Sequence, residues 1–441
     1  MRSILISLAI LFGAISVFAQ TPTEVLATST IRSFTAQDLS PEISKAWISL
    51  PETMANARKI LLDRQIEDVL LEVAAAENKM KVNEFITASV AKKVPDPSET
   101  QIKAVYDANK ADLENVPLSE VRSKIVEYLR QEPEKKAYED FIAGLKTTYK
   151  ITYVKDISAE RLIPPDVLAT VGPRSITYKD FTDKNALVLY EYEANMFDQV
   201  SASLNQAVEA AVLSEEAIGF GIAPSELIAR EITNKMQNYT DEEQSRLHSI
   251  LTKRLYEKYR VKFFLKAPAP YVQEVSVDDD PFQGDKNAPI TVVMFTDLEC
   301  PACAAVYPVL KNVVAEYGAR IKFVIRDFPL EGIHANAFGA AVAANAANNQ
   351  GKYFEYKELL YKNQDSLDTE SLVKLAKQIG MDEKKFRSDL GETKYAEEVR
   401  KDIEDGEKYG VNSTPTIFVN GIKVRVLSAQ AFREAIDRFA K

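Results

Sequence analysis

Both cysteines of this 441-residue chain, Cys300 and Cys303, lie in one segment, separated by only two residues. The run ITVVMF (290–295) before them is apolar and β-branched, which predicts a buried strand. Pro301 favours the first turn of a helix, where its missing N–H costs nothing. We therefore expect a helix over about residues 302–317. This order indicates a cysteine pair held where a buried strand passes into a helix N-terminus.

The segments after this helix alternate between strand and helix patterns. IKFVIRDF (321–328) predicts a second strand, and a long helical stretch follows from His334 to Lys408. TPTIFVNGIKVRV (414–426) predicts two strands joined by a hairpin turn at Asn-Gly. An amphipathic helix over residues 428–440 ends the chain. These elements predict an α/β domain with a helical insertion.

With this order of elements, residues 287–441 resemble the DsbA-like thiol–disulfide oxidoreductases of the thioredoxin superfamily. The resemblance is carried by DDDPFQGDKNAPITVVMFTDLECPAC, FVIRDFPLEGIHANAF, YGVNSTPTIFVNG and the terminal helix. It implies a thioredoxin fold, a redox-active disulfide between Cys300 and Cys303, and no bound cofactor. It also implies that Pro415 is cis and that the backbone of Thr414 pairs with an extended substrate as an added strand.

The position of the cysteines supports the same chemistry on physical grounds. Cys300 stands at a predicted helix N-terminus, where free N–H groups and the positive end of the helix dipole lower a thiol pKa. Cys303 follows one turn later on the same face, so it can attack a mixed disulfide at Cys300. A zinc site would need two further ligands, and only His248 and His334 remain in the chain. A purely structural disulfide would close a short, strained loop.

Three residues leave the direction of electron flow open. Pro301 and Ala302 between the cysteines include no histidine, whereas the best-known DsbA oxidases have Pro-His there, which suggests a milder oxidant. Thr414 is common in isomerases and reductases of the superfamily, while those oxidases have valine. We therefore expect Pro301 and Ala302 to influence the reactivity of the thiols. The sequence does not predict whether the protein oxidises or reduces its substrates.

Three further residues near the cysteine pair have ambiguous roles. Many relatives place a buried acid in the strand before the cysteines, and the equivalent place here is Met294. Glu299 precedes Cys300 and is expected to be a solvated loop acid. The alternatives are that it partly substitutes for the missing buried acid, or that its like charge raises the pKa of the Cys300 thiol. His334 is expected to start a helix of the insertion, with thiol tuning as the alternative.

An internal repeat occupies the first part of the chain. VLATSTIRSFTAQDL (25–39) matches VLATVGPRSITYKDF (167–181) without gaps, and residues 65–86 match residues 207–228 at the same offset. The copies end alike, in LKTTYKITY and LYEKYRVKF, and the second copy is shorter. Apolar residues at i, i+3, i+4 and i+7 predict helices. Units of this length are too long for a solenoid, so we expect a duplicated, mainly helical domain.

Residues 22–265 resemble the helical chaperone part of SurA and trigger-factor-like proteins. The resemblance rests on the hairpin-like VGPRSITYKDF, the helix pair LNQAVEAAVLSEEAIGFGIAPSELIAREI and the LKTTYKI-type end. It implies a surface that cradles unfolded polypeptide; a helical spacer or dimerisation module is the alternative. The predicted boundaries are repeat 1 at 20–155, repeat 2 at 156–265, a Pro-rich and acidic linker at 266–286 and the thioredoxin-like domain at 287–441.

The first residues, MRSILISLAILFGAISVFAQ, are typical of a secretory signal over residues 1–19. The apolar run is short for a membrane anchor, so we expect cleavage after Ala19. The expected location is the periplasm or another extracytoplasmic space, with a soluble mature protein. A net charge of −10 without a long basic patch argues against nucleic acid as a partner. No metal is expected.

Together these features predict an α+β protein, with a mainly helical duplicated region followed by an α/β thioredoxin fold carrying a helical insertion. The predicted function is exchange of disulfides in secreted, cysteine-containing or unfolded polypeptides. The resemblance to DsbA-like proteins implies a membrane redox partner, a quinone-linked thiol oxidase. The alternatives are a disulfide isomerase or reductase kept reduced by a membrane donor, and a non-catalytic holdase chaperone.

Overall fold

The computed structural model describes residues 23–110, 116–159 and 161–440. The expected signal segment, residues 1–19 with cleavage after Ala19, lies outside the described residues. The chain divides into two compact units, Met1–Pro268 and Ala269–Lys441. The first is mainly helical and the second is an α/β domain, so the predicted α+β class is confirmed.

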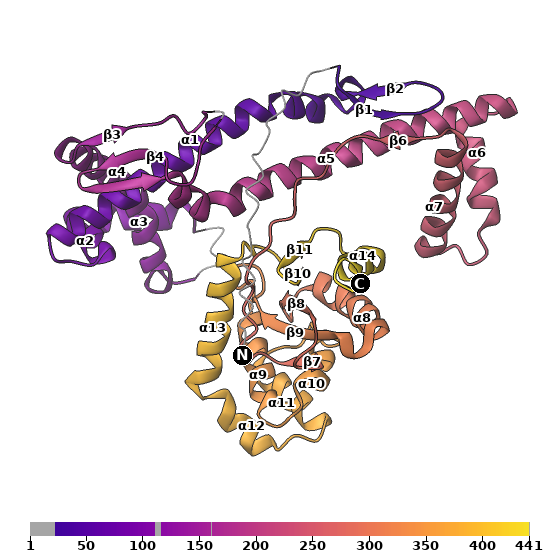
Figure 1. The fold of residues 1–441 in the computed structure, drawn as a ribbon. Helices are drawn as coiled ribbons and strands as arrows, with labels where there is room; N and C mark the ends of the chain where they lie inside the picture. The colour runs from indigo at the N-terminus through magenta and orange to yellow at the C-terminus, as the bar shows by residue number, and fades with distance from the viewer. Residues whose placement is uncertain (1–22, 111–115, 160, 441) are drawn as a thin grey trace, which may run out of the picture. The chain divides into compact units, whose positions relative to one another are not determined.

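The first unit contains the same order of elements twice (Figure 1). In each copy a β-hairpin leads into a very long helix, a short helix, and then a closing strand after two further helices in the first copy and one in the second. The hairpins end in matching capping boxes, Thr35 with Asp38 and Thr177 with Asp180, which satisfy free N–H groups where a helical turn begins. The first copy comprises β1 (Val25–Thr28), β2 (Ser33–Thr35), α1 (Pro41–Glu77), α2 (Val82–Ser89), α3 (Glu99–Ala108), α4 (Leu118–Thr148) and β3 (Ile151–Tyr153). The second comprises β4 (Val167–Val171), β5 (Arg174–Thr177), α5 (Tyr178–Phe220), α6 (Pro224–Glu231), α7 (Asp241–Lys258) and β6 (Lys262–Phe263).

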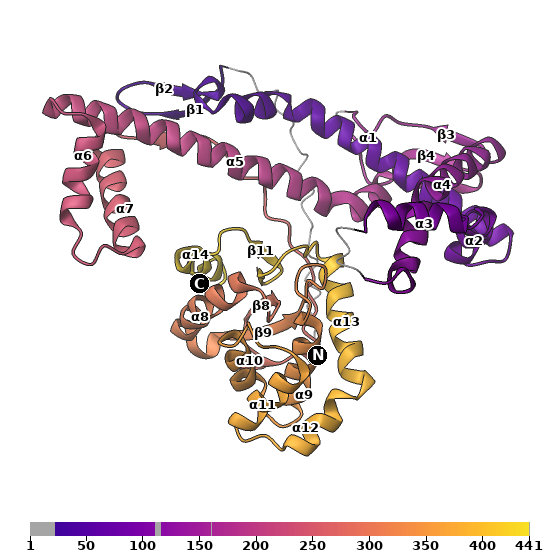
Figure 2. The same ribbon diagram turned by 180° about the vertical axis from the view of Figure 1, so that it is seen from behind.

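The two copies exchange their closing strands. β6 of the second copy pairs with β1 of the first, and β3 of the first pairs with β4 of the second. This gives two three-stranded sheets, ordered β2-β1-β6 and β3-β4-β5. The helices α1 and α5 run side by side between the sheets, as both views show (Figures 1 and 2). The repeat is therefore one interlocked unit.

The hydrophobic cores of this unit also mix the copies. At one end Trp47 of α1 packs with Phe34 and with Leu204 of α5. At the other end Ile66 of α1 packs with Phe181 of α5. Trp47 is therefore a core residue.

The second unit is built on a five-stranded sheet of order β11-β10-β8-β9-β7. β8 and β9 are parallel, and β10 is antiparallel to β8. The helices α9 to α13 form the insertion between β9 and β10. The strands are β7 (Phe282–Gly284), β8 (Ile290–Thr296), β9 (Ile321–Asp327), β10 (Thr416–Val419) and β11 (Ile422–Val424). The helices are α8 (Pro301–Tyr317), α9 (Ala337–Asn348), α10 (Tyr353–Tyr361), α11 (Thr369–Gln378), α12 (Glu383–Leu390), α13 (Thr393–Lys408) and α14 (Ala429–Asp437).

Much of the stretch expected as a linker, residues 266–286, belongs to this domain. β7 adds to the sheet beside β9, and Val272 forms a bridge with Ile422 of β11. The sequence pattern was misleading because β7 has only three residues and lies among prolines and aspartates. The segment is ordered by pairing at two sheet edges, which a local pattern does not reveal.

The hairpin turn between β10 and β11 gives a stability prediction. Gly421 has a φ of +78°, and a Cβ there would lie 1.9 Å from the carbonyl oxygen of Gln273. We expect Gly421→Ala to lower the free energy of unfolding by about 2–4 kcal/mol, from left-handed backbone strain plus the clash. Gly332→Ala is the matched control, because a Cβ added there would meet no atom within 4 Å. It should change the free energy of unfolding little. Urea denaturation of both variants measures the difference, and equal stabilities would contradict the prediction.

Candidate active site

Cys300 lies where β8 meets α8, at the N-cap of the helix with Pro301 in its first turn. Its side chain is mostly buried, and both cysteines are reduced in this structure. The S–H of Cys303 donates to the Cys300 sulfur, and together with the backbone N–H groups of Cys303 and Ala302 it lowers the pKa of Cys300 to about 5. Burial opposes this shift. Cys300 is therefore a thiolate at neutral pH, the form that attacks disulfides.

Cys303 has the opposite environment. Its side chain is fully buried, and burial followed by the neighbouring Cys300 raises its pKa. The two sulfurs of one motif are thus separated chemically into an ionised, outer one and a protonated, inner one. This asymmetry suits an exchange reaction in which Cys300 forms the mixed disulfide and Cys303 resolves it.

The Thr414–Pro415 peptide bond is cis, and it lies against the cysteine pair. The carbonyl oxygen of Thr414 is 3.5 Å from the sulfur of Cys300. The structure thus brings together Cys300, Cys303 and the Thr414–Pro415 segment, which are far apart in the sequence.

The loop before Cys300 is bonded to the start of the insertion. The buried carboxylate of Asp297 accepts hydrogen bonds from the backbone N–H of Leu330 (2.8 Å), and it contacts Nδ1 of His334 at 2.7 Å. This contact raises the pKa of His334. His334 therefore precedes α9, as expected for a residue at the start of the insertion, and it is also bonded to the loop that leads into Cys300.

Glu299 differs from the expected solvated loop acid. Its carboxylate accepts the backbone N–H of Asn336 at 2.7 Å and the side-chain amide of the same residue at 3.2 Å. Asn336 is the N-cap of α9, so Glu299 binds a helix start that has free N–H groups. The sequence did not reveal this role because the partner lies 37 positions later, at the start of the insertion.

The insertion also supports the backbone of the motif. The side-chain amide of Gln364 donates to the carbonyl oxygens of Leu298 (2.9 Å) and Cys300 (3.0 Å). The hydroxyls of Thr296 and Tyr361 are 2.5 Å apart. Sequence analysis missed both Gln364 and Tyr361; polar residues recurring in the apolar pattern around α10 were the only available signal.

Met294, at the place where many relatives have a buried acid, is fully buried in the core. Other ionisable groups are nevertheless buried in the domain, among them Asp327 at the end of β9 and Lys357 on α10. Burial raises the pKa of Asp327 and lowers that of Lys357. Met294 thus supplies no acid behind the motif, while Asp327 and Lys357 are buried on two other elements.

The pKa of Cys300 can be measured directly. We expect the absorbance of the thiolate at 240 nm, and the rate of alkylation by iodoacetamide, to fall as pH drops through about 5. Because the folded pKa lies below the unfolded one, the reduced protein gains stability as pH rises from about 5 toward 9. Cys300→Ser should lose both signals; a titration midpoint near 8.5 in the wild type would contradict the prediction.

Comparisons with known proteins agree with this geometry. The family model described as Thioredoxin matches residues 276–438. A curated relative, the Na(+)/H(+) antiporter NhaA 1 of Mycobacterium sp. (strain KMS), is 36% identical over 169 residues, which cover 37% of this chain and 28% of that protein. The Na(+)/H(+) antiporter NhaA 3 of Salinispora tropica is 35% identical over 147 residues, or 33% of this chain and 22% of that protein. The matches thus span less than a third of these relatives' length.

Solved structures with a similar domain include oxidised BdbD from Bacillus subtilis, 22% identical, with 39% of this chain and 99% of that chain covered and a TM-score of 0.35. Another is α-DsbA1 from Wolbachia pipientis, which is 20% identical, with 38% of this chain and 94% of that chain covered and a TM-score of 0.34.

Over the described part of the chain, no helix has the length and apolar character needed to cross a membrane.

The strand order, the helical insertion, the cysteine pair at the start of α8 and the family match together define the class of the second unit. It is a thioredoxin-like domain. Its match covers residues 276–438, so this assignment concerns the domain and not the interlocked repeat.

Proposed function

We propose that the protein is an exported thiol–disulfide oxidoreductase that acts on cysteines of unfolded or secreted polypeptides. The observation that carries the proposal is the asymmetry of the pair, an ionised Cys300 at the N-terminus of α8 above a buried, protonated Cys303. Export is supported by the signal-like residues 1–19 and by an active pair suited to an oxidising compartment.

In the oxidising direction, a substrate thiolate attacks the Cys300 sulfur of the Cys300–Cys303 disulfide, and Cys303 leaves as a thiolate that takes up a proton. A second substrate thiolate then attacks the substrate sulfur of the mixed disulfide, and Cys300 leaves. The substrate gains a disulfide and the protein is reduced by two electrons. The backbone of Thr414 lies where an extended substrate can pair beside Cys300.

The low pKa of Cys300 favours oxidation of substrates as the net direction. A stabilised thiolate favours the reduced protein, and this makes the disulfide form a stronger oxidant. A pKa of about 5 lies between those of thioredoxin (about 7) and DsbA (about 3.5). A membrane thiol oxidase linked to quinone would then regenerate the disulfide. The alternative, an isomerase or reductase kept reduced by a membrane donor, is favoured by Thr414.

Equilibration with glutathione buffers separates these directions. The oxidase proposal expects a reduction potential above about −200 mV. A potential near about −270 mV, the value for thioredoxin, would reject it in favour of a reductase.

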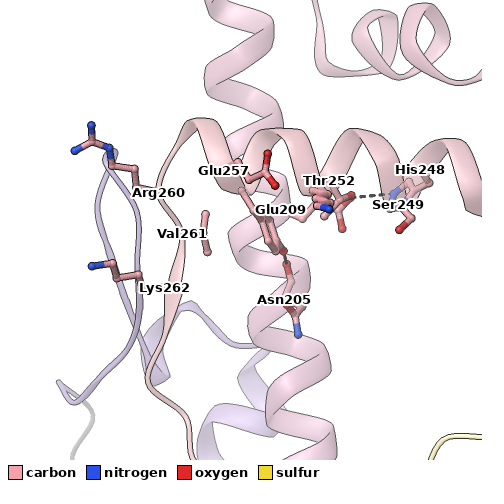
Figure 3. A pocket seen from close by; sticks show the side chains of 11 residues that line it. Asn205, Glu209, His248, Ser249, Thr252, Glu257, Arg260, Val261 and Lys262 are labelled. Atoms are coloured by element: carbon pink, nitrogen blue, oxygen red, sulfur yellow. Dashed lines mark hydrogen bonds and ion pairs between the residues drawn. The ribbon is translucent and has the colours of Figure 1, made fainter. Parts of the chain in front are cut away.

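We further propose that the repeat binds unfolded substrate chains. One groove of about 730 Å³ lies between α5, α7 and β6, lined by Asn205, Glu209 and His248 among others (Figure 3). A second groove of about 390 Å³ lies beside α1 and β3 and includes Asp63. The repeat alignment places Asp63 on Asn205, so the two grooves share one equivalent position.

Extended polypeptide is the occupant that these grooves favour. β3 and β6 are edge strands of their sheets, with one side open to pair with a further strand. Tyr153 and Phe263, equivalent in the repeat, are 62% and 40% exposed on these edges. A chain held there would raise the local concentration of substrate near Cys300. Binding by the repeat without catalysis, as a holdase, is the second candidate function.

An aggregation assay with the Cys300→Ser/Cys303→Ser variant tests this part separately. The variant should still slow aggregation of an unfolded client, and adding Tyr153→Ser and Phe263→Ser should weaken that effect. Unchanged protection after the aromatic substitutions would show that the grooves are not the binding site. Full rescue of cells by the double cysteine variant would make the holdase the main function.

A further inference from the structure

Lys357 is an unusual residue for the interior of a domain. Its side chain is fully buried in α10, and its Nζ has no hydrogen-bond partner among the described residues. Nζ lies 3.2 Å from the ring centroid of Tyr307 and 5.3 Å from that of Tyr361. A buried ammonium without a hydrogen-bonded partner is strongly disfavoured, so burial favours the neutral amine. A neutral lysine is a base.

The charges that act on Lys357 come from several elements. Burial is the largest effect and lowers its pKa, while Asp327, Glu358 and Cys303 act in the opposite direction and Lys311 adds to the lowering. Asp327 is itself fully buried, with burial raising its pKa, and it accepts a hydrogen bond from Asn345 at 2.6 Å. Lys357 therefore has Cys303 within electrostatic range and, among the described residues, no ion-pair partner.

A pair of hydroxyls links the inner cysteine to the same helix. The hydroxyl of Thr296 interacts with the Cys303 sulfur, and it lies 2.5 Å from the hydroxyl of Tyr361. Tyr361 is on α10, one turn after Lys357. Thr296 and Tyr361 thus form a short hydrogen-bonded path that begins at the sulfur and ends on the helix that carries the amine.

Cys303 needs a group that accepts its proton when it acts as a nucleophile. Its sulfur is fully buried, so water has no direct access to its proton. Met294 lies in the strand directly behind the motif, and its side chain cannot accept a proton. The proton must move to another group inside the domain.

We propose that Lys357 accepts the proton of Cys303 when Cys303 resolves a mixed disulfide, with Thr296 and Tyr361 positioning the transfer. This inference rests on the proposed thiol–disulfide exchange. The S–H proton moves to Nζ, the Cys303 thiolate attacks the Cys300 sulfur, and the Cys300–Cys303 bond forms as the bond to the substrate sulfur breaks. The departing thiolate carries the electron pair. In the reverse reaction the Lys357 ammonium returns the proton to Cys303.

The two sulfur steps can be followed separately with Ellman's reagent, 5,5′-dithiobis(2-nitrobenzoate). Attack by Cys300 on the reagent releases one coloured thiolate, and resolution by Cys303 releases a second. We expect Lys357→Met, which keeps the length and apolar stem of the side chain, to slow the second release by roughly 10²-fold at pH 7. The first release should be unchanged. In the variant the second rate should rise steeply with pH, whereas the wild type should be much less sensitive.

Lys352→Met is the matched control, because Lys352 is on the surface and pairs with Glu355. It should leave both releases unchanged. A folded Lys357→Met protein whose second release stays within twofold of the wild type would overturn the inference. If Lys357→Met does not fold, Tyr361→Phe takes its place. We expect Tyr361→Phe to slow the second release roughly 10-fold and to show the same steeper pH profile. An unchanged second release in Tyr361→Phe would overturn the inference. A wild type that releases no second thiolate would instead contradict the proposed function.

Discussion

Cys300→Ser is expected to abolish thiol–disulfide exchange by this protein. A serine hydroxyl is not ionised at neutral pH and cannot form a disulfide, and Cys303 is fully buried and protonated, so it cannot replace Cys300 as the attacking group. We expect the rate of disulfide formation in a reduced, unfolded substrate to fall by roughly 10³-fold or more, to the background rate. The measurement is loss of free thiols in the substrate over time.

Two controls define the meaning of that loss. Lys352→Met, a surface change, should retain the wild-type rate, and the thermal unfolding of Cys300→Ser should show that the domain is still folded. Substantial activity in a folded Cys300→Ser protein would mean that Cys300 is not the attacked sulfur, and it would contradict the proposed mechanism.

The second large effect is expected at Arg326, which is fully buried in β9. Its guanidinium forms ion pairs with Asp280 (3.1 Å), Asp402 (2.5 Å) and Asp405 (3.1 Å). We expect Arg326→Met to lower the free energy of unfolding by about 3–5 kcal/mol, because buried carboxylates lose their positive partner. Urea denaturation measures this change, and a loss below about 1 kcal/mol would contradict it.

The pH dependence of that variant has a defined sign. Burial, followed by the charge of Asp402, already raises the pKa of Asp280 to about 9, and Arg326 opposes this shift. Without Arg326 the carboxyl groups should hold protons even more tightly in the folded state. Because the folded variant then binds more protons than the unfolded chain, its stability should fall as pH rises from 5 to 8. Arg387→Met, which removes an exposed pair with Glu370, is the control and should show little change.

The catalytic part of the domain could be predicted from the sequence because its signals are local. A β-branched run, the two cysteines and Pro301 occur in one stretch, and β8, Cys300 and α8 follow that order in the structure. Thr414 and Pro415 were placed at the site through family resemblance alone. The contact between the Thr414 carbonyl and Cys300 joins residues more than a hundred positions apart, so no periodicity indicates it.

The groups that support the cysteines were missed for a related reason. Asp297 and Glu299 look like ordinary loop acids until the insertion brings Leu330, His334 and Asn336 against them. Lys357 looks like a surface lysine in a charged helix, and only its burial against Tyr307 shows otherwise. Burial of a charged side chain depends on the packing of several elements and leaves little trace in one sequence.

The strand pairing in the repeat also could not be predicted from the local sequence pattern. The matching segments correctly indicated two copies of one helical unit. They did not indicate that β3 and β6 exchange, because each strand pairs just as well with either hairpin on local pattern alone. The mixed cores around Trp47 and Ile66 depend on α1 lying beside α5, which requires the full length of both helices.

Trapping of partners is the most direct test of the central claim that Cys300 exchanges disulfides with other polypeptides. In Cys303→Ser the first attack remains possible, but the mixed disulfide can no longer be resolved from within the protein. The account predicts that this variant, expressed in the exported compartment, carries polypeptides attached through Cys300 that a reductant releases. Cys300→Ser/Cys303→Ser should carry none. A folded, exported Cys303→Ser protein without attached partners would contradict the account.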